Sequence, residues 1–187
     1  MLGGTPRFVQ GLTAVAIAVI ALAITAGPAT AATTRAEYVA QVDPVCQAAQ
    51  AQEEAAARPV SKKLKRLHKQ ERMKKASRKA RGRAAKREMR LLAGFYDYVV
   101  AVEHGVNAQI ATIPPAIEDT SLVQVWLRAR GEALVVTQRL FRALAKGQFF
   151  AAFELLIEVE TKAAEASDLV RDFGFRYCSS PAGQLGF

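Results

Sequence analysis

The chain has 187 residues, of which 26 are Lys or Arg and 17 are Asp or Glu, so its formal net charge is +9. Hydrophobic residues make up 51% and aromatic residues only 7%, and the excess is mostly alanine, which favours helices. Once a leader is removed, this length supports one domain and is too short for two comfortable ones. The sequence holds no G-x-S-x-G, P-loop, dinucleotide-binding or zinc motif, so it lacks the signatures of those enzyme and metal-site classes.

The first residues have the pattern of a secretion signal. Arg7 is the only charge before an apolar stretch from Phe8 to Ala26, and Ala29 and Ala31 then form the small-residue site that a signal peptidase needs. We therefore predict a signal peptide over 1–31 and an exported protein, either extracellular or associated with the cell envelope. The alternative is an uncleaved membrane anchor, because about twenty apolar residues also span a bilayer.

Two cysteines lie near opposite ends of the remaining domain, 32–187. Export places Cys46 and Cys178 where disulfides persist, so the sequence predicts that they pair and close a loop of about 130 residues. Two unpaired buried thiols are the alternative. No histidine or third cysteine lies at ligand spacing from either sulfur, so we predict neither a metal nor a cofactor.

The first helical pattern follows the leader directly. Thr34 and Glu37 have the spacing of a capping box, in which each side chain accepts a backbone N–H of the other residue. Because proline removes a backbone donor and crowds the preceding turn, we expect a kink or restart at Pro44, with Asp43 as its cap. The same reasoning predicts that this first helix stops at Pro59.

The segment 61–90 is strongly basic. It holds fifteen Lys or Arg against Glu71 and Glu88, which gives 15 − 2 = +13, more than the charge of the whole chain. Such charge density repels itself, so we predict a solvated helix extension or a partly disordered arm, with Gly82 as its weak point. The basic residues are Lys62, Lys63, Lys65, Arg66, Lys69, Arg72, Lys74, Lys75, Arg78, Lys79, Arg81, Arg83, Lys86, Arg87 and Arg90.

Residue types within 61–90 separate the functions of a basic run. A groove for single-stranded nucleic acid needs aromatic platforms, and the segment has none. Membrane insertion needs an apolar face, and the scattered Leu64, Leu67, Met73 and Met89 do not form one. We therefore expect purely electrostatic attachment to an anionic envelope polymer or to lipid headgroups, with nucleic acid less favoured. A solvated arm without a partner is the alternative.

Three further helices follow the basic segment. We predict a second helix from Leu91, a third from Thr120 or Ser121 to Gly147, and a fourth from Gln148 to Gly174. The first of these has a core-facing stripe made of Leu91, Leu92, Phe95, Val99, Val102, Val106, Ile110 and Ile113. The inner positions of the third helix are Leu122, Val125, Trp126, Ala129, Ala133, Val136, Leu140, Ala143 and Leu144.

The fourth predicted helix has two faces. Its inner face is predicted to hold Phe149, Phe153, Leu156, Ala163, Val170 and Phe173. Its solvent face holds Glu154, Glu158, Lys162, Glu165, Asp168 and Asp172, with Glu158 and Lys162 as an i,i+4 pair. Short connections between the helices predict an all-α, four-helix up-down bundle with the Lys/Arg-rich segment between helices one and two, followed by a tail at 179–187.

The sequence lacks the functional sites that are typical of helical bundles. A di-metal carboxylate centre needs a glutamate three residues before a histidine, and neither His68 nor His104 has one. We expect His104 to be an exposed surface residue and predict no catalytic residues. The sequence favours a non-enzymatic bundle held at the envelope; the alternative is a carrier or sensor that encloses an apolar ligand between helices two to four.

Several short motifs resemble those of uncharacterised exported helical proteins of high-GC actinobacteria. They are Tyr38 followed by Cys46, Ile113-Pro114-Pro115, Trp126-Leu127, Ala143-Leu144-Ala145-Lys146-Gly147, and Gly174-Phe175 before Cys178. The resemblance implies a helical bundle with a bridge from Cys46 to Cys178, and it implies no particular activity. Relative to that pattern, the basic segment is an insertion or extension.

Overall fold

The computed structural model describes residues 34–73 and 77–179. The predicted signal peptide, including Ala29 and Ala31, and nearly all of the tail lie outside these ranges. The described elements are α1 (Arg35–Met73), α2 (Arg78–Ile110), the 3₁₀ turn η1 (Ile117–Asp119), α3 (Thr120–Lys146), α4 (Phe149–Leu169) and the 3₁₀ turn η2 (Arg171–Phe173).

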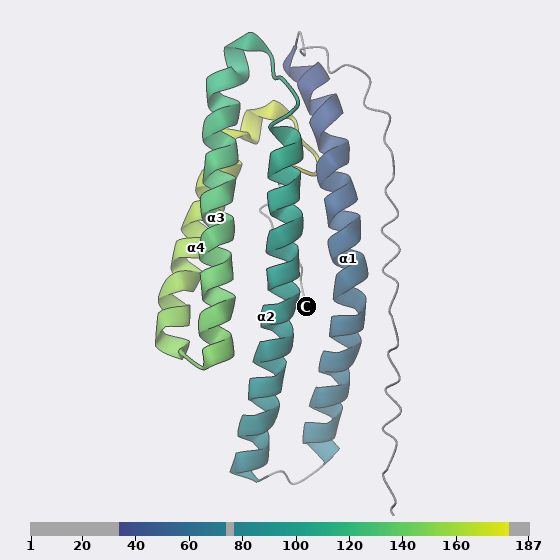
Figure 1. The fold of residues 1–187 in the computed structure, drawn as a ribbon, viewed down its shortest axis with the longest axis vertical. Helices are drawn as coiled ribbons and strands as arrows, with labels where there is room; N and C mark the ends of the chain where they lie inside the picture. Colours follow the sequence, from purple (N-terminus) through teal and green to yellow (C-terminus); the bar gives the residue numbers. More distant parts are fainter. Residues whose placement is uncertain (1–33, 74–76, 180–187) are drawn as a thin grey trace, which may run out of the picture.

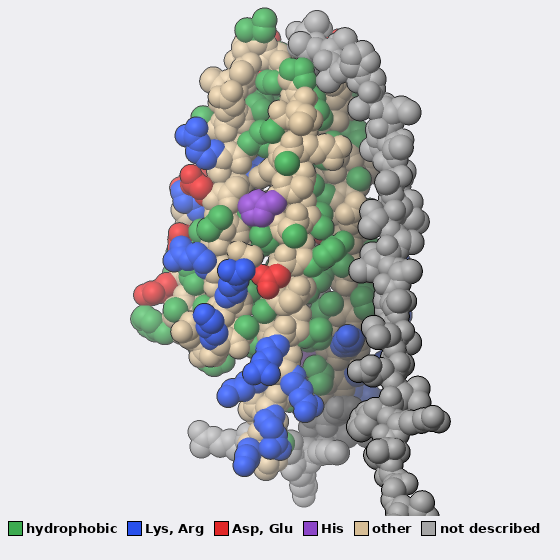
Figure 2. Space-filling model, in the orientation of Figure 1, with side chains coloured by type: hydrophobic (Ala, Val, Ile, Leu, Met, Phe, Trp, Pro, Cys, Tyr) green, Lys and Arg blue, Asp and Glu red, His purple; other side chains and the backbone are tan. Residues whose placement is uncertain are grey.

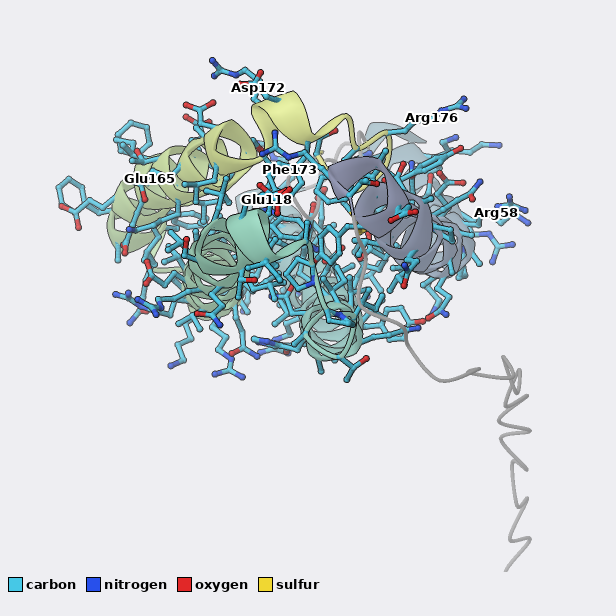
Figure 3. The ribbon with its side chains drawn as sticks, turned by 90° about the horizontal axis from the view of Figure 1, so that it is seen from above. Arg58, Glu118, Glu165, Asp172, Phe173 and Arg176 are labelled. Atoms are coloured by element: carbon cyan, nitrogen blue, oxygen red, sulfur yellow. A yellow bond between two sulfur atoms is a disulfide. The ribbon has the colours of Figure 1, made fainter. Side chains whose placement is uncertain are left out.

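The four long helices run alternately up and down, each packed against the next in the chain (Figure 1). This confirms the predicted all-α up-down bundle. Seen from above, α1 and α4 lie on opposite sides of the molecule, and η2 contacts both of them (Figure 3). The lower ends of α1 and α2 extend past the turn between α3 and α4, so one end of the molecule is a two-helix hairpin.

The start of α1 has the predicted capping box. The backbone N–H of Glu37 donates to Thr34 Oγ1 over 3.2 Å, and the N–H of Thr34 donates to Glu37 Oε2 over 3.0 Å. Arg35, one residue on, donates to both carboxylate oxygens of Asp119, over 2.6 and 2.9 Å. This pair ties the first turn of α1 to the start of α3, and the Arg35 guanidinium lowers the pKa of the Asp119 carboxyl.

The restart that we allowed at Pro44 and the end that we predicted at Pro59 are both absent from α1. The helix is continuous through both prolines. Each proline removes one hydrogen bond, but the helix beyond Pro59 gains packing: Val60 lies against the cluster of Phe95 and Tyr96 on α2. Tertiary packing therefore outweighs the local cost of the proline.

Asp43 has a different role from the helix cap that we predicted. Its carboxylate accepts the backbone N–H groups of Arg176 and Tyr177, both over 2.9 Å, and of Cys178 over 3.2 Å. Three charge-assisted hydrogen bonds thus hold the C-terminal segment against α1. These hydrogen bonds hold Cys178 near Cys46 in addition to the bond between the two sulfur atoms.

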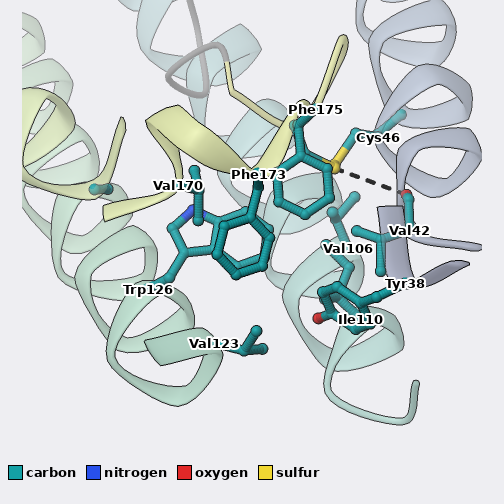
Figure 4. Packing of buried hydrophobic residues seen from close by; sticks show 13 residues of the cluster. Tyr38, Val42, Cys46, Val106, Ile110, Val123, Trp126, Val170, Phe173 and Phe175 are labelled. Carbon is teal, nitrogen blue, oxygen red and sulfur yellow. Dashed lines mark hydrogen bonds between the residues drawn. A yellow bond between two sulfur atoms is a disulfide. The ribbon is translucent and has the colours of Figure 1, made fainter. Parts of the chain in front are cut away.

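The main hydrophobic core surrounds this junction (Figure 4). Tyr38 comes from α1, Ile110 from α2 and Trp126 from α3, and all three are almost completely buried. Phe175 from the C-terminal segment stacks on Trp126 with 5.2 Å between ring centroids, and Phe173 stacks on Phe175 at 5.4 Å. The segment after α4 is therefore a core element that fills the space between α1 and α3.

The predicted disulfide between Cys46 and Cys178 is present, with 5.3 Å between the two Cα atoms and 132 residues of separation. Replacing both cysteines with alanine should lower the free energy of unfolding by about 2–4 kcal/mol, because the unfolded chain regains the freedom of a long open loop. Urea unfolding of the oxidised protein, the reduced protein and the double variant measures this. Equal midpoints for all three would contradict it.

The remaining helices differ from prediction mainly at their ends. α2 begins at Arg78, so the stripe that we assigned from Leu91 is the second part of a longer helix. α3 ends as predicted at Gly147, whose φ of 75° is the left-handed conformation that glycine adopts without strain. α4 ends at Leu169, short of the predicted Gly174, because the chain there turns into η2 and the core.

Two side-chain assignments on α3 and α4 were also wrong. Val125, predicted to face inward, is exposed, as are Phe149, Phe153 and Leu156. The expected Glu158–Lys162 pair is not formed: Glu158 lies 3.8 Å from Arg139 on α3, and Lys162 pairs with Glu165 on α4 over 3.0 Å and with Glu132 on α3 over 3.2 Å. The polar arc of α4 thus borders α3, and part of the apolar side of α4 faces outward.

Candidate functional site

The basic segment forms the protruding end of the α1–α2 pair. We call residues 61–73 of α1 and 77–90 of α2 the basic hairpin. Leu64 is buried, and Leu67, Ala80 and Ala84 are partly buried. These apolar side chains come from two antiparallel helices, α1 and α2, which pack against each other. This explains how a segment without a continuous apolar face is helical on both sides of residues 74–76.

The cations of the basic hairpin point to solvent. The exposed ones are Lys62, Lys63, Lys65, Arg66, Lys69, Lys79, Arg81, Arg83, Lys86, Arg87 and Arg90. The side chains of Arg72, Lys74, Lys75 and Arg78 lie outside the described part of the chain. Glu88 is paired with His68, over 3.1 Å, and within the described residues none of the exposed cations has a carboxylate partner. The hairpin therefore presents its positive charge to solvent (Figure 2).

The exposed cations of the basic hairpin repel one another, and the start of α2 adds a further unfavourable electrostatic interaction. Ser77 caps the helix by accepting the backbone N–H of Ala80 over 3.3 Å, but the first turn contains no acidic residue. Basic side chains at this end face the positive pole of the helix dipole, which disfavours them. An anion bound along the hairpin would relieve both the mutual repulsion of the cations and this unfavourable placement.

Sequence reasoning missed a second polar feature, a buried charge cluster formed by Glu53, Glu103 and Arg130. These side chains come from α1, α2 and α3, and the residues are 4%, 7% and 8% exposed. Arg130 donates from Nη2 to Glu103 Oε2 over 2.6 Å and from Nε to Asn107 Oδ1 over 2.8 Å. Its Nη1 donates to the carbonyl of Cys178 over 3.4 Å, so the cluster also contacts the disulfide segment.

Glu53 is the least compensated member of the buried charge cluster. The pKa of its carboxyl is raised to about 8, first by burial and then by the negative charge of Glu103, while Arg130 opposes the shift. Because Glu103 is ion-paired with Arg130 and the pKa of Glu53 is raised, we assign the proton of this carboxyl pair to Glu53. Its Oε1 has no hydrogen-bond partner among the described residues.

The pattern of α2 and α3 contained a signal for two of these residues. Glu103 lies four residues after Val99 and three before Val106, inside the stripe that we assigned to the core. Arg130 lies four residues after Trp126 and four before Leu134, on the same face as both. A carboxylate and a guanidinium on the buried faces of two helices would have indicated an ion pair across them.

A small cavity of about 30 Å³ lies between α3 and α4, next to this cluster. It is lined by Trp126, Arg130, Ala133, Leu134, Thr137, Val159, Ala163, Ala166, Ser167 and Cys178. This volume admits a water molecule or two and is far too small for an acyl chain. A carrier function between these helices would require α3 and α4 to separate.

We also looked among the described residues at His104, at possible metal ligands and at helices that could span a membrane. His104 is exposed on α2, as expected. Across 34–73 and 77–179, no three His, Cys, Asp or Glu side chains are grouped so that they could hold a metal ion. No helix in these ranges combines the length and apolar character needed to cross a membrane.

The fold and the site define a class of protein: a disulfide-linked helical bundle with a protruding basic hairpin. No known protein family, curated protein or solved structure matches the chain. Its function must therefore be inferred from its own residues.

Proposed function

We propose that this protein is an exported, non-enzymatic helical bundle that its basic hairpin holds at an anionic component of the cell envelope. The observation that carries the proposal is the set of exposed, unneutralised Lys and Arg side chains on the hairpin. A cation that meets a polyanion releases condensed counterions, and this gain grows with the number of cations engaged.

The geometry of the hairpin supports a binding role. A disordered basic arm would lose conformational entropy on binding, whereas these cations are already held on two packed helices. The disulfide is compatible with export, because such bonds persist outside the cytoplasm.

A charge-neutralising variant tests the proposal in cells. Replacing Lys62, Lys63, Lys65 and Arg66 with glutamine removes four exposed charges while keeping good helix formers. We expect the wild-type protein to be found in the envelope fraction and released by high salt, and the variant to be found in the medium. Cell fractionation followed by immunoblotting measures this.

The matched control removes four positive charges from elsewhere on the surface. It replaces Arg128, Arg139, Arg171 and Arg176, all exposed and outside the hairpin, with glutamine. We expect it to stay in the envelope fraction like the wild type. Envelope retention of the hairpin variant at the wild-type level, or equal release of both variants, would contradict a role for the hairpin.

A further inference from the structure

The first turns of α4 carry an exposed aromatic patch. Phe149, Phe150 and Phe153 are 65%, 80% and 62% exposed, and Leu156 and Ile157 extend the patch by one turn. Glu154 and Glu158 border it on one side of the helix, and Glu160 follows Ile157 at its upper end. Large apolar side chains gathered in this way on an exported protein's surface are costly unless something covers them.

The aromatic patch borders the basic hairpin at Phe149. A groove of about 690 Å³ separates α2 from the α3–α4 turn, and Phe149 lines it together with Lys86 and Arg90. Lys146 at the end of α3 lines the same groove, and Met89 and Leu144 add to its apolar lining. In Figure 2, apolar side chains at this turn lie next to the basic side chains of the lower end. Cations and aromatic rings from elements far apart in sequence thus share one end of the molecule.

We infer that this end of the protein docks on an anionic lipid bilayer surface, with the basic hairpin against the headgroups and the phenylalanines among the upper acyl chains. Within 61–90 alone, membrane insertion was disfavoured because no apolar face exists there; the fold supplies that face from α4. A bilayer with acidic headgroups offers negative charge and an apolar layer together. A soluble wall polymer offers only the charge. The inference rests on the proposed function, whose anionic component it identifies as lipid.

Vesicle binding tests the inference. The protein is purified in the form in which the cell exports it. The probes are vesicles of phosphatidylglycerol and phosphatidylcholine, and vesicles of phosphatidylcholine alone. We expect binding to the first kind only, and this binding should weaken as the salt concentration rises. Replacing Phe149, Phe150 and Phe153 with glutamine should weaken binding at least tenfold at each salt concentration, because the apolar contribution is lost.

The matched control replaces three exposed apolar residues outside the patch, Ile117, Val125 and Val135, with glutamine. It should bind vesicles like the wild type. Equal binding by the aromatic variant and the wild type would overturn the membrane inference. The inference would also be overturned if the wild-type protein did not bind anionic vesicles but was retained on isolated envelopes in a salt-sensitive way. That result would agree with the proposed function, with a polymer as the anionic partner. If the variant with glutamine at Lys62, Lys63, Lys65 and Arg66 were still retained in the envelope fraction, the proposed function itself would be overturned.

Discussion

Replacing Arg130 with leucine is expected to lower the free energy of unfolding by about 3–5 kcal/mol. The guanidinium is the only positive charge in the described buried charge cluster, where it neutralises Glu103 and donates to the carbonyl of Cys178. Without it, the Glu103 carboxylate remains buried beside the protonated Glu53, and Glu103 must take up a proton or draw in water. The loss measures the cost of an uncompensated buried charge more than the strength of one ion pair.

Urea unfolding of oxidised protein measures this effect against Arg128→Leu, which changes an exposed arginine on the same helix. The control should shift stability by about 0.5 kcal/mol or less. Adding Glu103→Leu to Arg130→Leu should restore part of the loss, because both partners are then apolar. Equal stability of the Arg130 and Arg128 variants would show that the cluster does not stabilise the fold.

The second large effect is a loss of stability as the pH rises. The pKa of Glu53 is raised from 4.5 to about 8 in the folded protein, so between these values the folded state holds a proton that the unfolded state has released. Its contribution is complete below about pH 4.5 and is lost as the pH rises through 8. A rise of this kind in the pKa of a carboxyl group corresponds to a loss of stability on the order of a few kcal/mol.

Glutamine at position 53 imitates the protonated carboxyl and does not titrate. Glu53→Gln should therefore remove this decline and be more stable than the wild type at pH 8, with little difference at pH 4.5. The control is Glu54→Gln, which changes the exposed neighbour on α1 and should keep the wild-type pH dependence. Urea midpoints from pH 4.5 to 8.5 compare the three proteins. A pH dependence that is identical in wild type and Glu53→Gln would show that Glu53 is not the group responsible.

Local signals predicted the fold well where one physical effect dominates. The capping box at Thr34, the apolar stripe of α2, the glycine at 147 and the cysteine pair each have one strong local or covalent cause, and all four are present. Pro59 was misjudged because its cost is local, whereas the packing of Val60 that offsets it comes from α2. Such compensation is visible only once partner helices are known.

The aromatic start of α4 was misjudged for a related reason. Apolar residues there occur nearly all round the helix, so periodicity alone did not reveal which of them face the bundle. Ala152 is buried while the larger Phe149, Phe150 and Phe153 are exposed. A small residue allows α4 to approach α3 closely, and the phenylalanines lie outside the contact.

The candidate site was predicted by composition but not by shape. Charge density in 61–90 indicated an exposed segment and left helix and disordered arm as alternatives. The described residues on both sides of 74–76 form two helices that pack against each other, where Leu64 is buried and His68 is paired with Glu88, twenty positions along the chain. The adjacent aromatic patch comes from α4, so no local pattern within the basic segment predicted it.

The salt dependence of binding to isolated cell envelopes tests the electrostatic role of the basic hairpin most directly. The logarithm of the binding constant should fall linearly with the logarithm of salt concentration. Replacing Lys62, Lys63, Lys65 and Arg66 with glutamine should make that slope shallower by up to about four. The four-arginine control from outside the hairpin should keep the wild-type slope. Binding that is independent of salt, or equal slopes for the hairpin variant and the wild type, would contradict the account.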